Sequence, residues 1–184
     1  MPIIVDQLKM TPAAALTSTA ATQVVQTTAG ANLVMGMPGS ARLSANKFWV
    51  YAAGYAQALG PGTFTATVNP ILYGDASLAT VTTKPLFTST AGTLAYTGTA
   101  ATGVTLPWYI QAEINGDVAA SSFNGEAESN ICGTYKIRTQ LVAPVSSINF
   151  NTEPPAKFAI GNTGGGTFAS GMKFVVETFQ IIDE

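Results

Sequence analysis

Apolar and polar residues alternate with a period of two in several segments of the chain. In residues 63–68, three apolar residues alternate with three threonines, and residues 108–114 show a similar alternation. Successive side chains of a β-strand point to opposite faces of a sheet. These patterns therefore predict strands with one face in the core and the other face open.

Two later segments show variants of this pattern. In residues 134–142, the alternation predicts that Tyr135, Ile137, Thr139 and Leu141 face the core, whereas the charged residues between them face solvent. That arrangement is typical of a half-buried strand. Residues 172–182 carry apolar groups at both odd and even positions, which indicates a strand that is central in a sheet or covered on both sides.

Turn-forming residues separate these segments and predict an all-β fold. The clearest predicted strands are residues 47–55, 63–73, 108–114, 134–142 and 172–182, and the weaker ones are residues 81–88, 94–97, 123–128, 145–150 and 157–160. Turns are indicated at Pro38-Gly39, Gly60-Pro61-Gly62, Asn115-Gly116 and Asn124-Gly125. No segment has a helical period with caps. We predict an antiparallel β-sandwich of the jelly-roll or Greek-key kind.

The first part of the chain differs in composition from the rest. Residues 11–31 are small, polar and nearly uncharged. We predict that residues 1–31 form an extended N-terminal arm and that residues 32–184 form a single β-sandwich domain. A disordered tail is the alternative interpretation of the arm on composition alone.

Charged residues are scarce, which changes the expected surface. They make up 10% of the 184 residues, hydrophobic residues make up 47%, and the mean hydropathy is +0.28. Desolvating threonine or alanine costs less free energy than desolvating lysine or glutamate. This composition favours a surface that other protein subunits cover, and the alternative is a charge-poor soluble monomer.

The same composition argues against several classes of partner. The net charge is −2, and the eight Lys and Arg residues are scattered, so no basic patch for nucleic acid is predicted. No stretch is long and apolar enough to span a bilayer. The first ten residues do not have the pattern of a cleaved signal. We therefore expect neither a nucleic-acid nor a membrane partner.

Candidate chemistry in the sequence is sparse. The chain has no histidine, which removes the commonest general base and the commonest zinc ligand. The single cysteine, Cys132, cannot form an intramolecular disulfide and is expected to be a small buried group. The glycine-rich residues 161–167 lack the lysine and the following helix of a phosphate-binding loop, so we interpret them as a flexible connection.

Acidic residues offer the main route to an enzymatic function. Four of them converge if a hairpin forms at Asn115-Gly116, namely Glu113, Asp117, Glu126 and Glu128. Two carboxylates at a suitable separation are enough for a glycosidase, but solvated charges on an outer face are the favoured interpretation. A calcium site that uses Asp75, or Asp117 with Glu126, lacks the loop pattern that would support it. We predict no catalytic, cofactor-binding or metal-binding residues.

Aromatic residues are the candidates for ligand binding. The strand segments contain six of interest, namely Phe48, Trp49, Tyr51, Tyr55, Trp108 and Tyr109. They form either part of the core, which is the more frequent fate of such residues on strands, or a platform on which sugars stack.

Several of these segments together resemble a family of viral proteins. They are residues 42–55, 62–68, 72–74, 108–114 and 174–181. The chain resembles β-sandwich structural proteins of tailed bacteriophages, and among them the capsid decoration, or cement, proteins. The resemblance implies a homo-oligomer, often a trimer, that binds the major capsid protein on the outer surface of the virion after assembly in the host cytoplasm. It also implies that residues 1–31 clasp a neighbour. A major capsid protein of the common tailed-phage type is not expected, because the long helix of that fold is missing.

The predicted function is therefore mechanical. We predict a non-enzymatic virion protein without cofactors that stabilises a capsid through protein–protein contacts. Two alternatives stay open at this point. One is a tail-tip or fibre module that binds host glycans through exposed aromatic residues, and the other is a glycan hydrolase that uses Glu113, Glu126 or Glu128.

Overall fold

The described part of the chain consists of β-strands and short connections between them. The computed structural model describes residues 3–9, 23–24, 34–36, 47–58, 62–75, 85–89, 92–98, 105–117, 122–131, 134–141, 157–162, 165–166 and 172–183. Within these residues, the structure contains no helix that is long and apolar enough to cross a membrane.

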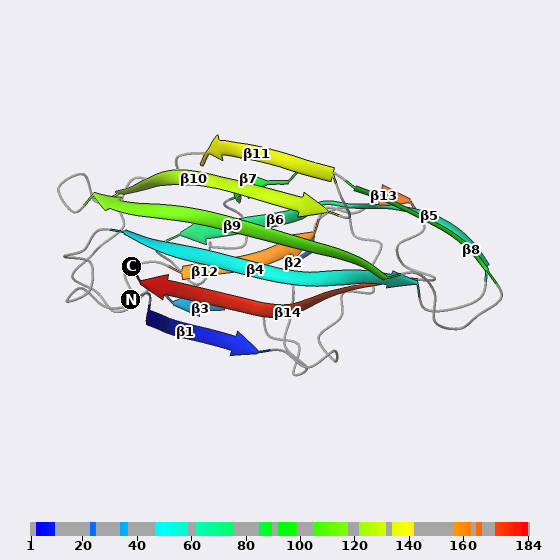
Figure 1. Ribbon diagram of the computed structural model, residues 1–184, viewed down its shortest axis with the longest axis horizontal. Helices are drawn as coiled ribbons and strands as arrows, with labels where there is room; N and C mark the ends of the chain where they lie inside the picture. Colours follow the sequence, from blue (N-terminus) through cyan, green and yellow to red (C-terminus); the bar gives the residue numbers. More distant parts are fainter. Residues whose placement is uncertain are drawn as a thin grey trace.

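Six antiparallel strands form the largest sheet (Figure 1). Their order across the sheet is β1 (Ile3–Lys9), β14 (Met172–Asp183), β4 (Lys47–Ala58), β9 (Thr105–Asp117), β10 (Ser122–Ile131) and β11 (Thr134–Gln140). Strand β14 lies between β1 and β4 and is therefore not at an edge of the sheet, which agrees with the central position that is one of the two arrangements predicted for residues 172–182.

A second antiparallel sheet lies behind the first in Figure 1. It contains β2 (Gln23–Val24), β12 (Lys157–Asn162), β6 (Pro70–Asp75) and β7 (Pro85–Thr88), and β3 (Val34–Gly36) also pairs with β12. Three more strands form a small sheet at one end of the molecule, namely β13 (Gly165–Gly166), β5 (Gly62–Val68) and β8 (Gly92–Gly98).

Large apolar side chains from both main sheets make up the core. The largest fully buried ones are Phe158, Phe174, Phe179, Leu72, Leu86, Ile110, Ile114 and Ile131. They come from β6, β7 and β12 of one sheet and from β9, β10 and β14 of the other. The described part of the chain is therefore an all-β antiparallel sandwich, and the predicted fold class is confirmed.

The alternation predicted for residues 108–114 is also confirmed. Trp108, Ile110 and Ile114 are buried, and the residues between them are half-buried on the other face of β9. By contrast, residues 63–73 do not form one strand. The chain breaks at Asn69 and passes from the small sheet to the second sheet. Ser89 stabilises this crossing, because its Oγ donates a hydrogen bond of 2.8 Å to Asn69 Oδ1.

Both predicted Asn-Gly turns are wrong. Asn115 and Gly116 lie inside β9, opposite Asn124 and Phe123 of β10, and the hairpin between the two strands closes only beyond Asp117. Gly125 is needed for backbone geometry within the strand. Its φ is 153°, and a Cβ at this position would overlap the carbonyl oxygen of Glu113.

The orientation predicted for residues 134–142 is wrong for the first part of this segment, whereas Leu141 at its end is buried as predicted. Tyr135 and Ile137 are 48% and 73% exposed. Between Lys136 and Thr139, β11 has one more residue than the facing stretch of β10, which is a β-bulge. Lys136 instead points toward the second sheet, where its Nζ donates a hydrogen bond of 2.6 Å to Thr88 O.

A second bulge explains the pattern of β14. Val176 faces Gly54 and Thr178 faces Ala53, so Glu177 is an extra residue that the register skips. The bulge reverses the alternation, which places the apolar residues before and after it on the same buried face. These residues are Phe174, Val176, Phe179 and Ile181.

Parts of the predicted arm lie within the sheets. Ile3–Lys9 pairs with β14, and Gln23–Val24 pairs with β12. The boundary at residue 31 stays a prediction. Cys132 and the predicted strand at residues 145–150 lie outside the described residues. In the glycine-rich stretch, Gly161 and Asn162 end β12, and Gly165–Gly166 pairs with β5.

Candidate functional site

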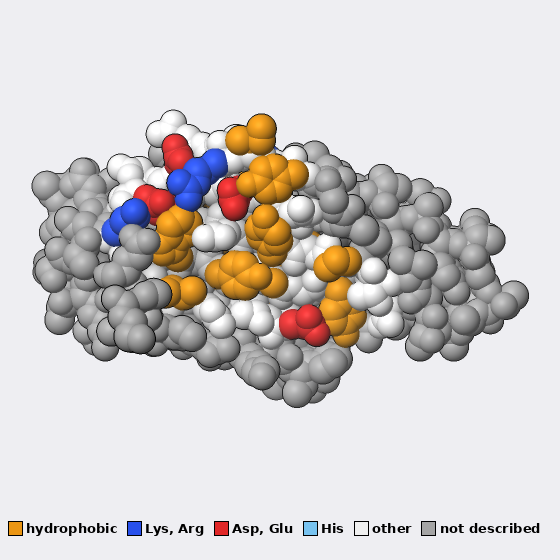
Figure 2. All heavy atoms as spheres, in the orientation of Figure 1, with side chains coloured by type: hydrophobic (Ala, Val, Ile, Leu, Met, Phe, Trp, Pro, Cys, Tyr) orange, Lys and Arg blue, Asp and Glu red, His pale blue; other side chains and the backbone are white. Residues whose placement is uncertain are grey.

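The outward side of the six-stranded sheet, which we call the front face, carries the candidate residues. The alternation of three central strands builds it. The described side chains that contribute are Lys47, Trp49, Tyr51, Ala53, Tyr55 and Gln57 of β4, Thr105, Pro107, Tyr109, Gln111, Glu113 and Asn115 of β9, and Asn124, Glu126, Glu128 and Asn130 of β10. Each is half-buried or exposed, whereas the described residues between them are buried. Figure 2 shows this face, with apolar side chains across its middle.

The predicted aromatic set divides between this face and the core. Trp108 is buried, and its ring stacks on Phe174 with centroids 4.7 Å apart and an interplanar angle of 9°. Trp49, Tyr51, Tyr55 and Tyr109 are half-buried on the front face. The side chain of Phe48 lies outside those described. Neither interpretation of the set, core or platform, therefore holds for all of its members.

One end of the front face is an ion-pair cluster around Trp49. Lys47 Nζ lies 5.9 Å and Arg138 Cζ lies 5.3 Å from the centroid of the Trp49 ring. Glu113 Oε1 is 3.2 Å from Lys47 Nζ, and Glu113 Oε2 is 3.6 Å from Arg138 Nη1. The cations in Figure 2 gather at this end of the face.

The structure brings together two of the four carboxylates that the sequence singles out. Glu113 and Glu126 face each other across β9 and β10, and Arg138 Nη1 is 3.9 Å from Glu126 Oε2, so one guanidinium serves both. Side chains this exposed form ion pairs that contribute little stability individually. The side chains of Asp117 and Asp75 lie outside those described.

Glu128 has a different partner from the other two. It accepts a hydrogen bond of 2.7 Å from the Tyr135 hydroxyl. This bond, with smaller contributions from burial and from the negative charge, raises the pKa of Tyr135. The pKa of Tyr109 is also raised, first by burial and then by Glu128 and Tyr51. Glu128 therefore favours the neutral form of two tyrosines.

Substitution of Glu128 by glutamine is expected to lower the pKa of Tyr135 and Tyr109, because the carboxylate that opposes phenolate formation is removed. The hydrogen bond of the native protein is present in full below the unfolded-state pKa of about 10, and its contribution to stability is lost as the pH rises through the higher folded-state pKa. Titration of tyrosine absorbance at alkaline pH measures the expected decrease in the pKa of the two tyrosines. Identical titration curves for native protein and variant would contradict this assignment.

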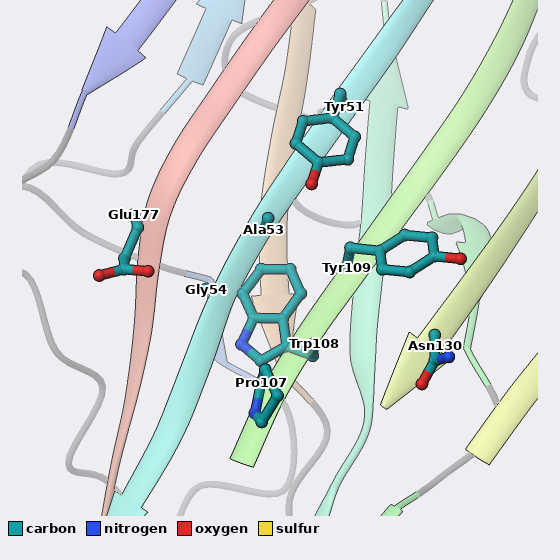
Figure 3. A pocket seen from close by; sticks show the side chains of 8 residues that line it. All are labelled: Tyr51, Ala53, Gly54, Pro107, Trp108, Tyr109, Asn130 and Glu177. Atoms are coloured by element: carbon teal, nitrogen blue, oxygen red, sulfur yellow. The ribbon is translucent and has the colours of Figure 1, made fainter. Parts of the chain in front are cut away.

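A shallow hollow occupies the middle of the front face (Figure 3). Its volume is about 520 Å³, and its lining is formed by Tyr51, Ala53 and Gly54 of β4, Pro107, the buried Trp108 and Tyr109 of β9, Asn130 of β10 and Glu177 of β14. The small residues at Ala53 and Gly54 leave the surface low between larger neighbours. The rings of Tyr51 and Tyr109 lie beside it, with centroids 6.4 Å apart and an interplanar angle of 28°.

Two of the polar residues at the hollow were not singled out from the sequence. Asn130 has no distinctive pattern around it, but the sequence contains a signal for Glu177. An isolated charge within the apolar segment 172–182 indicates a break in the alternation, and the bulge of β14 places Glu177 on the outside.

Comparison of the sequence with family models and with curated proteins finds no significant match. Among solved structures, the crystal structure of an alginate lyase from Pseudomonas aeruginosa is similar with a TM-score of 0.31 and 8% sequence identity, over 87% of this chain and 72% of that chain. This degree of likeness establishes neither a shared family nor a shared activity.

Proposed function

We propose that this protein is a non-enzymatic structural protein of a virion, and specifically a decoration protein that binds the major capsid protein on the outer surface of a tailed-phage head as a homo-oligomer. The observation that carries the proposal is the composition of the edge strand β11. Among the described residues, the exposed large apolar side chains are Tyr135 and Ile137, and both belong to this strand.

The cations of β11 are engaged within the same chain. Lys136 bonds to Thr88 O and lies 4.8 Å from the centroid of the Phe87 ring, and Arg138 pairs with Glu113 and Glu126. The bulge and the inward lysine disfavour a further strand along this edge. We therefore assign the contact with a neighbouring subunit to the side chains of β11 and not to an extended ladder.

The mechanism follows from mass action. A subunit that binds only the assembled shell stabilises that shell by its binding free energy. A charge-poor contact suits this role, because threonine and isoleucine lose less solvation free energy on burial than ionised groups do. The resemblance of the strand segments to decoration proteins supports the same setting.

Substitution of Ile137 by lysine is expected to weaken subunit contacts by about 2 kcal/mol, or roughly 30-fold in affinity, because a charge replaces an apolar side chain in the middle of the contact. Sedimentation measures the oligomeric state, and co-sedimentation with phage heads stripped of their decoration protein measures shell binding.

The matched control is Thr139→Lys, which adds the same charge to an exposed position two residues away on the same strand. It is expected to have a smaller effect. A native protein that is a monodisperse monomer with no affinity for stripped heads would overturn the proposed function. Equal effects of the two lysine substitutions would instead show that the subunit contact is not centred on Ile137.

A further inference from the structure

We propose that the hollow on the front face is a binding site for one uncharged pyranose unit of a glycan chain. The hollow lies mainly over β4 and β9, and it reaches the β11 edge only at Asn130 of β10, which pairs with Tyr135. The inference therefore goes beyond the proposed attachment to a shell and does not depend on it.

The shape of the hollow suits a sugar ring. Tyr51 and Tyr109 provide neighbouring aromatic surfaces, and Ala53 and Gly54 leave room beside them (Figure 3). One face of a pyranose ring presents C–H groups, which pack against aromatic rings, while its hydroxyl groups point outward. A volume of about 520 Å³ is within the usual range for small-ligand sites, roughly 300–1,000 Å³. The hollow is open to solvent, so a glycan chain can continue beyond the bound unit.

The polar groups around the hollow match hydroxyl chemistry. Asn130 contributes an amide with donor and acceptor atoms, Glu177 contributes carboxylate acceptors, and the two tyrosine hydroxyls both donate and accept. Sugar hydroxyls also donate and accept, so each of these groups has a complementary partner on a pyranose ring.

The charges specify an uncharged sugar. Among the described residues that line the hollow, Glu177 is the one with a side chain of a type that is charged at neutral pH, and Glu128 lies near enough to raise the pKa of Tyr109. The cations Lys47 and Arg138 lie at the other end of the face, beside Trp49, and are paired with Glu113. A uronic acid would therefore approach a carboxylate without a compensating cation, which is unfavourable.

The experiment measures binding of short cello-, malto- and manno-oligosaccharides to the full chain by calorimetry or by ligand-observed NMR, with oligogalacturonate as the charged comparator. We expect saturable binding of at least one neutral series and weaker or no binding of oligogalacturonate. The Tyr51→Ala and Tyr109→Ala variants are each expected to bind about tenfold more weakly, because each removes one aromatic surface.

Trp49→Ala is the matched control, since it removes an aromatic residue from the same face outside the hollow. It is expected to bind like the native protein, and circular dichroism verifies that all variants are folded. Should an alanine at Tyr51 or Tyr109 prevent folding, the smaller change Ala53→Leu fills the hollow and is expected to reduce binding in the same way.

The proposal is overturned by the absence of saturable binding to every neutral series, by a preference for oligogalacturonate, or by equal loss in Trp49→Ala. A change in oligomeric state of the tyrosine variants, with no glycan binding by native protein, would assign the face to protein contacts instead.

Discussion

Alanine at position 54 is expected to lower the free energy of unfolding by about 3 kcal/mol or more. Gly54 lies in β4, opposite Val176 in the central part of the six-stranded sheet. A Cβ at this position would overlap the carbonyl oxygen of Val175. This neighbour is backbone and belongs to a paired strand, so it cannot move aside as the end of a flexible side chain can. The substitution must therefore displace β14 at its bulge or break the pairing with β4.

Urea denaturation followed by tryptophan fluorescence measures this effect at a fixed protein concentration. The matched control is Ala53→Ser, which adds one atom to the adjacent half-buried residue on the open side of the same strand. This control is expected to change stability by no more than about 0.5 kcal/mol. An equally small effect of Gly54→Ala would show that the close approach of β4 and β14 is not needed for the fold.

The fold class was predictable from the sequence because alternation is a local property. Trp108, Ile110 and Ile114 face the core as the period of two requires. Each of these inferences depends on the side chains of a single strand and on the geometry of an extended backbone. They needed no knowledge of which strands pair with each other.

The errors arose where the register between two strands decides the outcome. A single extra residue at Glu177 reverses the face of every later residue of β14, and another in β11 exposes Ile137. Similarly, Asn115 and Gly116 resemble a turn by themselves, yet the pairing of β9 with β10 continues to Asp117. Such features depend on the partner strand, so the alternation within one segment cannot reveal them.

The candidate site was predictable only in its residue types. The sequence identified Tyr51 and Tyr109 as possible binding residues, but it could not distinguish them from Trp108, which is buried. The carboxylates Glu113 and Glu126 were expected to converge through a turn that does not form, and they meet instead through the register of the longer strands. The hollow itself requires residues of four strands, and no local pattern indicates that combination.

Loss of the Trp108 side chain is the second large effect that we expect. Trp108 is 2% exposed and Phe174 is fully buried, and their rings stack across the inner face of the sheet. Trp108→Ala and Phe174→Ala are each expected to lower the free energy of unfolding by about 3–5 kcal/mol, because each leaves a cavity in the core. Gln57→Ala is the control, because Gln57 is half-buried on the front face of the sheet and does not face the core. This substitution is expected to be nearly neutral.

The milder pair Trp108→Leu and Phe174→Leu tests whether the two rings interact beyond their burial. If they do, the double variant is expected to be less destabilised than the sum of the single variants, with a coupling energy of about 0.5–1.5 kcal/mol, because the first substitution already removes the stacking. The chain has two tryptophans, so Trp49 reports unfolding in every variant that lacks Trp108. The buried Trp108 Nε1–H has no hydrogen-bond partner among the described residues, and the loss of this group should offset part of the cost of the tryptophan substitution. Trp108→Leu removes more volume than Phe174→Leu does, but it should therefore lower the free energy of unfolding by less than this difference in volume alone implies. Strictly additive effects would show that the rings stabilise the core by burial without a specific contribution from their contact.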